Sequence, residues 1–361
     1  MTDPRPPTPD PRPPIKVLIV EDSKVIREFI AYILSSDPKI KVIDMVCNGE
    51  EALEAVERLK PDVITMDIHM PKMDGLEATR RIMETHPTPI VIVSGSSAAK
   101  EVAGTFNALE AGAVAFAPRP KGIGTPEHES MAKELVQTVK LMSEVKVVKR
   151  WPKYRKQPTV PLVPAVRTET LPAQVQVVAI GCSTGGPMAL KTIISGLPNN
   201  FPVPVLIVQH ISPGFIEGFV QWLTTSSSFP VKVAAHGEYL LPGHAYVAPD
   251  GFHMEVDADK RIILNTGEPE NGLRPSVSHL LSSVTRVFGK HAIGMLLTGM
   301  GKDGAKELKI MREKEAVTIV QDKESSVVYG MAGEAVALGA AMYVLSPEEI
   351  ADLLKKLVGG L

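Results

Sequence analysis

Short runs of β-branched and other apolar residues alternate along most of the chain with longer segments in which apolar residues recur every three or four positions. Runs of the first kind are typical of buried strands, and segments of the second kind are typical of helices. A regular alternation of strands and helices predicts a parallel sheet with helices on both faces, in which ligands bind beyond the carboxyl ends of the strands. We therefore expect functional side chains directly after each strand.

The alternation forms two series. The first has five strand-helix units, and its strand-like runs are residues 16–20, 41–46, 63–66, 90–93 and 114–117. The second series is Rossmann-like, with strand-like runs at residues 175–180, 203–209, 292–298 and 317–320. Within it, three shorter runs separated by Gly and Pro predict an antiparallel extension, at residues 231–233, 245–248 and 262–264. Because 361 residues are about twice a typical domain, we predict two α/β domains, each a doubly wound parallel sheet.

Two segments interrupt the alternation. Residues 1–14 contain seven prolines, so they form neither a signal peptide nor a helix and predict an extended tail. Residues 145–158 carry six basic residues, no acidic residue and two prolines, which is typical of an exposed linker. Contact of this basic stretch with RNA is the less favoured alternative. The predicted boundaries are a tail over 1–14, a first domain over 15–140, a linker over 141–172 and a second domain over 173–361.

Charge and cysteine content exclude several classes of protein. The 39 Lys and Arg residues nearly balance the 41 Asp and Glu residues, and the formal charge of -2 provides no overall field to attract nucleic acid or an anionic membrane. Two cysteines cannot form a disulfide framework, and they suit a reducing compartment. No apolar run approaches the ~20 residues of a membrane-spanning helix. We therefore expect a cytoplasmic monomer that neither binds nucleic acid nor inserts into a membrane.

Three carboxylates follow two of the predicted strands in the first domain. Glu21 and Asp22 end the first strand and Asp67 ends the third, so the three meet at one edge of the sheet if those strands are neighbours. Their mutual repulsion favours a bound hard cation such as Mg²⁺, which prefers oxygen ligands. Ser94 ends the fourth strand, and Arg119 follows the fifth. A hydroxyl and a cation at this edge suit a phosphorylated aspartate, whose added oxygens require hydrogen-bond donors and positive charge.

The second domain opens on a strand, a glycine-rich turn and a helix. Gly181, Ser183 and Gly185 have the Gly-x-Ser-x-Gly spacing that presents a serine hydroxyl at a helix N-terminus. Backbone N–H groups at such a terminus bind either an oxyanion or a phosphate, so the turn is also compatible with a dinucleotide site. The usual Gly-x-Gly-x-x-Gly pattern is absent, however, because Ser183 occupies the position of its second glycine.

Serine is a weak nucleophile at neutral pH and requires a base. His210 ends the strand that follows the serine-bearing strand, and His253 and His279 are the less favoured alternatives. Asp303 lies in a glycine-rich loop after the strand at residues 292–298, and its carboxylate suits the third group, which orients the imidazole. The sequence therefore predicts a catalytic triad of Ser183, His210 and Asp303.

Four motifs make residues 15 to about 140 resemble the receiver domain of two-component response regulators. They are Val20-Glu-Asp-Ser23, Met66-Asp-Ile-His-Met-Pro-Lys-Met-Asp-Gly75, Val93-Ser94 and Phe116-Ala-Pro-Arg-Pro120. The resemblance implies that Asp67 accepts a phosphoryl group from a histidine kinase and that Mg²⁺ binds to Asp22, Asp67 and the His69 carbonyl. It also implies that Ser94 and Phe116 are switch positions.

The receiver resemblance has one departure from the family pattern. Receivers usually place Lys where this chain has Arg119. Lys carries a compact charge, whereas Arg is a bulkier planar fork, so the two are not interchangeable. Phosphorylation is still expected, and the strength of its coupling to output is the question that this switch position raises. Lys121 is the less favoured alternative for the cation.

Residues 175–358 resemble the catalytic domain of the chemotaxis protein-glutamate methylesterases, the CheB family. The motifs that carry the resemblance are Gly181-Cys-Ser-Thr-Gly-Gly186, Gln209-His-Ile-Ser-Pro-Gly-Phe215, Ala248-Pro-Asp-Gly251, Arg274-Pro-Ser-Val277 and Leu297-Thr-Gly-Met-Gly-Lys-Asp-Gly304. The resemblance gives the predicted triad the roles of nucleophile, base and orienting carboxylate. It further implies that the Thr184 and Met300 backbones are oxyanion donors and that Arg274 helps to seat the substrate.

The resemblance implies a hydrolase that removes γ-methyl esters from glutamates of methyl-accepting chemoreceptors and deamidates their glutamines. A chemotaxis histidine kinase would be the phosphodonor, with Mg²⁺ required at the receiver and no cofactor for the esterase reaction. The resemblance also implies that the unphosphorylated receiver covers the active site. The leading alternative is a receiver fused to a non-catalytic Rossmann-like nucleotide-binding module. A DNA-binding response regulator is disfavoured because the output region has no basic recognition helix.

Overall fold

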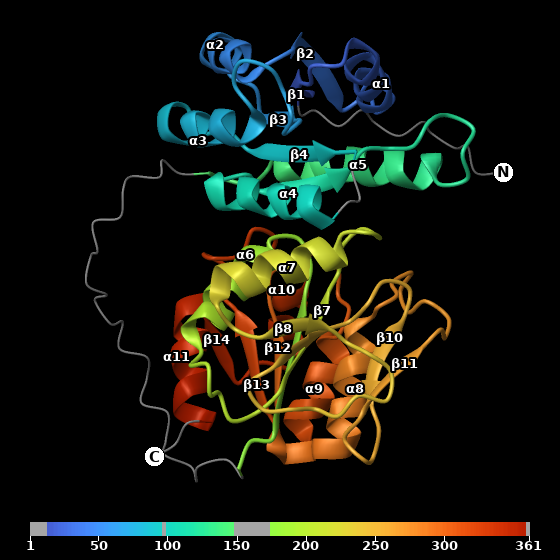
Figure 1. Ribbon diagram of the computed structural model, residues 1–361, viewed down its shortest axis with the longest axis vertical. Coiled ribbons are helices and arrows are strands. Elements are labelled where there is room, and N and C mark those ends of the chain that lie inside the picture. Colours follow the sequence, from blue (N-terminus) through green and yellow to red (C-terminus); the bar gives the residue numbers. More distant parts are fainter. Residues whose placement is uncertain (1–12, 96–98, 148–173, 359–361) are drawn as a thin grey trace, which may run out of the picture. The chain divides into compact units, whose positions relative to one another are not determined.

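The computed structural model describes residues 13–95, 99–147 and 174–358, and Figure 1 shows their ribbon. The predicted tail therefore lies almost wholly outside the described residues, as does most of the predicted linker. Contacts between Cα atoms divide the chain into two compact units. One unit comprises residues 1–95 and 111–152, and the other comprises residues 96–110 and 153–361.

The first unit is built on a five-stranded parallel sheet with strand order β2-β1-β3-β4-β5. Its strands are β1 (Ile15–Val20), β2 (Ile40–Val46), β3 (Val63–Met66), β4 (Ile90–Ser94) and β5 (Ala115–Pro118). The helices that alternate with them are α1 (Lys24–Leu34), α2 (Gly49–Leu59), α3 (Gly75–Thr85), α4 (Ala99–Ala111) and α5 (His128–Met142). Helices α1 and α5 contact each other on one face of the sheet, and α2 and α3 contact each other on the other face (Figure 1). The predicted fold is thereby confirmed for this unit.

The second unit contains a seven-stranded sheet with order β14-β13-β12-β6-β7-β9-β8, in which every neighbouring pair is parallel. Its strands are β6 (Val177–Cys182), β7 (Val205–Gln209), β8 (Val231–Val233), β9 (Ala245–Val247), β12 (Ala292–Leu296), β13 (Val317–Gln321) and β14 (Tyr343–Leu345). A separate antiparallel pair is formed by β10 (His253–Val256) and β11 (Ile262–Asn265). The doubly wound parallel fold predicted for the second domain is confirmed.

Helices cover both faces of the second sheet (Figure 1). Helix α6 contacts α7 and α11, whereas α9 contacts α8 and α10. Their bounds are α6 (Gly186–Gly196), α7 (Ile216–Ser227), α8 (Val277–Phe288), α9 (Ala305–Glu313), α10 (Met331–Ala337) and α11 (Pro347–Val358), with the short 3₁₀ helix η1 (Gly289–His291) after α8. Because both faces are covered, strands β6, β7, β12 and β13 are buried along their whole length, which is usual for parallel sheets.

The predicted antiparallel extension is only partly correct. Of the three short runs assigned to it, only residues 262–264 lie in an antiparallel strand, and that strand pairs with β10, which the sequence did not predict. The other two runs form β8 and β9, which continue the main sheet in parallel with β7. All three residues of β9 are buried. Burial on both faces is the pattern of a parallel strand, and it explains why β9 belongs to the main sheet.

Helix α4 is grouped by its contacts with the second unit. The buried Phe106 of α4 stacks on Trp222 of α7, with ring centroids 5.2 Å apart, and also contacts Phe219. Glu110 accepts a hydrogen bond of 2.8 Å from Trp222 Nε1 and lies 2.6 Å from Lys191 Nζ. The segment that follows β4 therefore contributes an aromatic and charged contact to the second unit.

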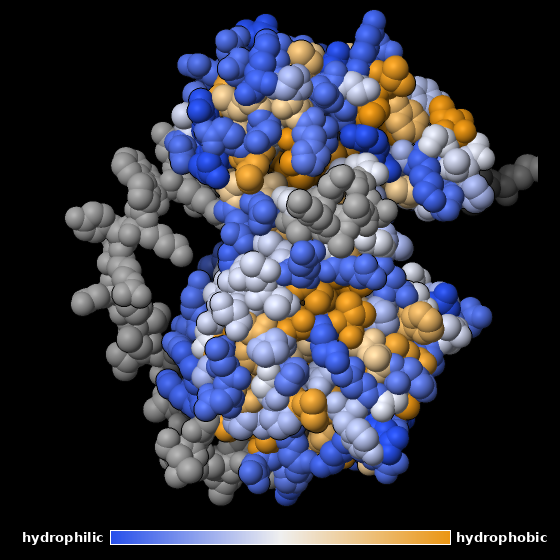
Figure 2. All heavy atoms as spheres, viewed as in Figure 1, coloured by the Kyte–Doolittle hydropathy of each residue, from blue (hydrophilic) through white to orange (hydrophobic). Residues whose placement is uncertain are grey.

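The surface is mostly polar. On the face shown in Figure 2, hydrophilic side chains predominate and apolar ones form small groups. Among the residues that the structure describes, no helix is both long enough and apolar enough to cross a bilayer. Cys47 and Cys182 are both free thiols.

Candidate functional site

The ends of three neighbouring strands bring the predicted triad together. In the second unit, β6 lies between β12 and β7, and Cys182 at the end of β6 is paired with Gln209 at the end of β7. The next residues, Ser183 and His210, therefore leave the sheet side by side. The His210 N–H donates to the Cys182 carbonyl at 2.8 Å, and the Ser183 N–H donates to the Thr298 carbonyl at 3.0 Å, beyond the end of β12.

The turn that carries Ser183 depends on glycine at several positions. Gly185 has a φ of 82°, in the left-handed region, and is the N-cap of α6. The Gly186 N–H donates to the Ser183 carbonyl at 2.8 Å and closes the turn. A Cβ atom at Gly299 would lie only 2.6 Å from the Ser183 Cβ, so the loop after β12 passes the serine at a distance that only glycine permits. Ser183 itself is half-buried.

Two backbone donors near the serine have no partner. In the part of the chain that the structure describes, the N–H groups of Thr184 and Met300 donate to no acceptor. An unpaired N–H pair beside a nucleophile is suited to an oxyanion. Arg274 is exposed, and its guanidinium donates to the carbonyls of Thr266 and Gly267 at 3.0 Å each. Its substrate-seating role stays a prediction.

Asp303 is buried in a dense set of donors. Its carboxylate accepts hydrogen bonds from the Ser276 hydroxyl at 2.8 Å, from the Ser278 hydroxyl at 2.7 Å and from the Val277 N–H at 2.7 Å. Asp303 Oδ2 also lies 3.0 Å from His210 Nε2. Burial raises the pKa of this carboxyl, but the His210 contact and the hydrogen bonds from Ser278 and Val277 outweigh burial and bring the pKa down to about 2. The carboxylate is therefore a permanent anion at neutral pH.

The His210 imidazole is almost buried, and its Nε2 faces the Asp303 carboxylate. The N–H is not aligned with the carboxylate oxygen, and Nε2 has no well-directed hydrogen bond. Catalytic hydrogen bonds are often loose in the absence of substrate. Because Nε2 faces the acid, Nδ1 is the nitrogen left for Ser183, although no hydrogen bond joins the two side chains among the described residues.

The alternative histidines are engaged elsewhere. His253 is fully buried, with Nδ1 accepting from the Ser276 N–H at 3.2 Å and Nε2 lying 3.1 Å from the Glu268 carbonyl. His279 stacks on His253 and pairs through Nδ1 with Glu255 at 2.8 Å. Neither ring has a nitrogen free to serve a nucleophile, which leaves His210 as the candidate base.

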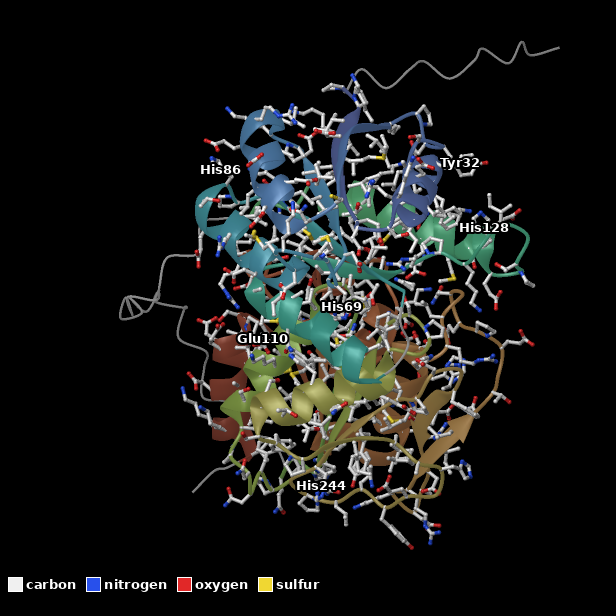
Figure 3. All side chains as sticks on the ribbon, turned by 45° about the horizontal axis from the view of Figure 1, so that its top comes forward. Tyr32, His69, His86, Glu110, His128 and His244 are labelled. Carbon is white, nitrogen blue, oxygen red and sulfur yellow. The ribbon has the colours of Figure 1, made fainter. Side chains whose placement is uncertain are left out.

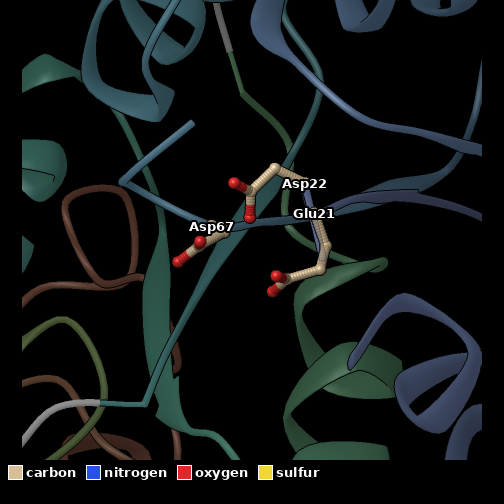
Figure 4. A group of neighbouring side chains, drawn as sticks. All are labelled: Glu21, Asp22 and Asp67. Carbon is tan, nitrogen blue, oxygen red and sulfur yellow. The ribbon is translucent and has the colours of Figure 1, made fainter. Parts of the chain in front are cut away.

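The acidic pocket of the first unit also forms as the sequence predicts. The register pairs Val20 with Met66, so the residues that follow β1 and β3 are neighbours. Oxygen atoms of Glu21, Asp22 and Asp67 lie within 4.8 Å of one another (Figure 4). Burial raises the pKa of Glu21 to about 7, and the Asp67 charge adds to this shift. Burial likewise raises the pKa of Asp67.

A set of crowded carboxylates whose ionisation is unfavourable fits a hard divalent cation such as Mg²⁺. Asp22 is exposed at the mouth of the pocket, as is His69, two residues after the central aspartate (labelled in Figure 3). A cation there has access to solvent and to an incoming phosphodonor. The coordination of Mg²⁺ by the His69 carbonyl stays a prediction.

Arg119 lies where the sequence predicts a cation. Its NH2 atom is 3.0 Å from Glu21 Oε2 and 3.6 Å from Asp67 Oδ1. A Cβ atom at Gly95 would lie 2.8 Å from the guanidinium, so glycine makes room for the larger arginine. Lys121, the alternative cation, pairs instead with Glu127 at 2.9 Å.

The two predicted switch positions lie on neighbouring strands. Ser94 is buried at the end of β4, and its carbonyl accepts the Arg119 N–H at 2.7 Å. Phe116 is half-buried on β5, paired with Ile92. Both therefore flank the acidic pocket, and their switch roles stay predictions.

Comparisons with known proteins agree with both halves of this description. The CheB methylesterase family profile matches residues 178–354, and the response regulator receiver domain profile matches residues 17–123. A protein-glutamate methylesterase/protein-glutamine glutaminase from Geobacter metallireducens is 58% identical over 344 residues, which are 95% of this chain and 99% of that protein. The chain belongs to the CheB family. A CheB relative of the same name from Nitrosospira multiformis is 57% identical and covers 95% of this chain and 97% of its own length.

A solved CheB structure is also similar. The CheB methylesterase catalytic domain of Thermotoga maritima is 38% identical, covers 52% of this chain and 100% of its own, and has a TM-score of 0.50. The resemblance to receivers and to CheB methylesterases is thereby confirmed. Since CheB methylesterases are hydrolases, the chain is an enzyme of that family, and a non-catalytic nucleotide-binding module is not supported.

Proposed function

We propose that this chain is a phosphorylation-regulated protein-glutamate methylesterase that acts on methyl-accepting chemoreceptors and also deamidates their glutamines. The observation that carries the proposal is the meeting of Ser183, His210 and Asp303 at the ends of adjacent strands, with His210 Nε2 3.0 Å from the buried carboxylate. The relatives named as methylesterases and glutaminases span nearly the whole chain and support it.

The proposed reaction is acyl transfer through Ser183. The serine Oγ attacks the ester carbonyl carbon while Nδ1 of His210 takes the hydroxyl proton, and Asp303 stabilises the imidazolium that forms. The free N–H groups of Thr184 and Met300 donate to the oxyanion of the tetrahedral intermediate. Methanol leaves with the proton from His210, and water attacks the acyl-enzyme by the same route to give glutamate. An amide substrate follows the same steps and releases ammonia.

Asp67 is the proposed phosphoryl acceptor, with a chemotaxis histidine kinase as donor. Asp22, Asp67 and the His69 carbonyl would hold Mg²⁺, with Glu21 beside them, and the ion would neutralise charge on the incoming phosphoryl group. The Arg119 guanidinium, 3.6 Å from Asp67 Oδ1, is placed to bind the added oxygens. Cation and arginine together would offset a charge that the crowded pocket otherwise disfavours.

Helix α4 provides a route from the phosphoryl site to the esterase site. It follows β4, whose end carries Ser94, and it packs through Phe106 on α7. Helix α7 in turn begins at Ile216, shortly after His210. A rearrangement at Ser94 on phosphorylation would therefore reach the base through α4 and α7. Coupling of about 1–3 kcal/mol, typical of such switches, would change activity by about 5–150-fold.

The test is methanol release from a methylated chemoreceptor by the full-length protein, with and without acetyl phosphate and Mg²⁺. Wild type should release methanol faster with acetyl phosphate, Ser183→Ala should lose at least about 10³-fold, and Asp67→Asn should not respond to acetyl phosphate. Absence of release by the wild type in both states would refute the hydrolase. Release that ignores acetyl phosphate would refute only the regulation.

A further inference from the structure

Gln209 is the last residue of β7 and is 2% exposed. Its amide nitrogen donates two hydrogen bonds, to the Ser183 carbonyl at 2.9 Å and to the His210 carbonyl at 2.8 Å. Its Oε1 accepts from the Cys182 thiol at 3.1 Å. One buried side chain thus joins the main chain of the candidate nucleophile to the main chain of the candidate base.

The surroundings of Gln209 fix the position of its amide. Gly186, the first residue of α6, is so close that a Cβ atom there would lie 2.2 Å from Gln209 Oε1. The amide oxygen is therefore held between α6 and the end of β6, and both amide N–H groups are used by the two carbonyls. A buried polar group with all its hydrogen bonds satisfied is rigid, and losing its donors would leave both carbonyls without these bonds.

We propose that Gln209 is a positioning residue, whose amide sets the distance between the Ser183 hydroxyl and Nδ1 of His210. The proposal rests on the proposed esterase function. Backbone bonds alone leave each loop free to turn about its strand end, whereas a shared donor requires the two carbonyls to keep one spacing. Proton transfer needs reacting atoms at hydrogen-bond distance, and a misplacement of about 1 Å costs about 10²-fold in rate.

Three variants of the full-length protein test this role. Gln209→Met has a similar length and no N–H group, and Gln209→Glu keeps the shape but in its protonated form can donate to only one carbonyl. The matched control is Gln321→Met. Gln321 is the last residue of β13 and is 1% exposed, but its amide binds the Thr298 N–H and the Ser325 carbonyl and touches neither Ser183 nor His210.

The main readout is the rate at which a fluorophosphonate labels Ser183, measured by mass spectrometry. In that reaction the Oγ–P bond forms, fluoride leaves and His210 takes the hydroxyl proton, so the rate reports serine-histidine alignment without the receptor. Methanol release from a methylated chemoreceptor gives kcat and KM, and thermal melting reports the stability of each variant.

Gln209→Met should be labelled about 10²-fold more slowly than wild type with KM little changed, and Gln321→Met should stay within about 5-fold. Gln209→Glu should lie between them at neutral pH and lose labelling at alkaline pH, because its ionised carboxylate would repel both carbonyls. This alkaline loss, absent from wild type, separates positioning from general destabilisation, and it decides the question if the Met variant does not fold.

Labelling of both Gln209 variants at the rate of the Gln321 control would overturn the positioning role. A wild type that hydrolyses receptor esters and is labelled at Ser183 establishes the esterase independently of this comparison. A wild type without labelling at Ser183 would overturn both proposals.

Discussion

Gly299 offers a test of how closely the esterase loops must pack. A Cβ atom at this position would lie 2.6 Å from the Ser183 Cβ, whereas ordinary contact begins at 3.4 Å, so Gly299→Ala must move the loop or the serine by about 0.8 Å. A shift of that size at a nucleophile costs roughly 10²-fold in rate. Overpacking of a buried site typically costs about 1–3 kcal/mol of stability. We therefore expect a folded protein with a large loss of activity.

Gly196→Ala is the matched control. Its Cβ would meet the Ala351 Cβ at the same 2.6 Å, but at the end of α6 against α11, where no triad residue lies. Fluorophosphonate labelling of Ser183 and thermal melting are measured for both variants. Gly299→Ala should be labelled about 10²-fold more slowly, and Gly196→Ala within about 3-fold of wild type. Equal labelling of the two variants would show that the close approach of the loop does not set the serine position.

Three further predictions concern charge and exposure. The lowered pKa of Asp303, about 2, gives the folded state stability that is present above pH ~4 and lost as the pH falls toward 2. The difference in unfolding free energy between wild type and Asp303→Asn, from urea titrations, should therefore shrink by about 2 kcal/mol between pH 6 and pH 2, and a constant difference would contradict the assignment. Arg119→Ala removes a cation 3.0 Å from Glu21 and should tighten Mg²⁺ binding about 10-fold in calorimetric titration, whereas weaker binding would show that the arginine helps to form the site. A thiol reagent should label Cys47 and spare Cys182 in the native protein, because burial raises the pKa of the Cys182 thiol, and equal labelling in peptide mapping would contradict that burial.

The sequence predicted the parallel strands well because they are buried on both faces and appear as continuous apolar runs. The predicted run at 63–66 coincides with β3, and that at 114–117 is displaced by one residue from β5 (Ala115–Pro118). Strand β14 was missed, since Tyr343–Leu345 is short and only partly buried. The direction of β8 and β9 depends on which strand they pair with, and three-residue runs do not encode that choice.

The chemical groups of the site were predictable because they follow strand ends, where such side chains gather. The groups that support them were not. Ser276 and Ser278 precede and begin a helix, so their polarity is equally explained by capping. Gln209 is one polar residue at the end of an apolar run, and nothing in the sequence shows that its amide turns back toward its own successor. Such roles depend on long-range pairing that only coordinates reveal.

The strand order of the second sheet has a consequence for biosynthesis. Strand β12 pairs directly with β6, yet β7 through β11 and helices α6 through α8 lie between them in the chain. Pairings between distant segments form slowly and late in folding. Ser183 emerges from the ribosome early, but its anion partner arrives only after most of the enzyme has been made. A nascent or truncated chain would thus display the serine without the means to activate it, which protects the cell from unregulated hydrolysis during synthesis.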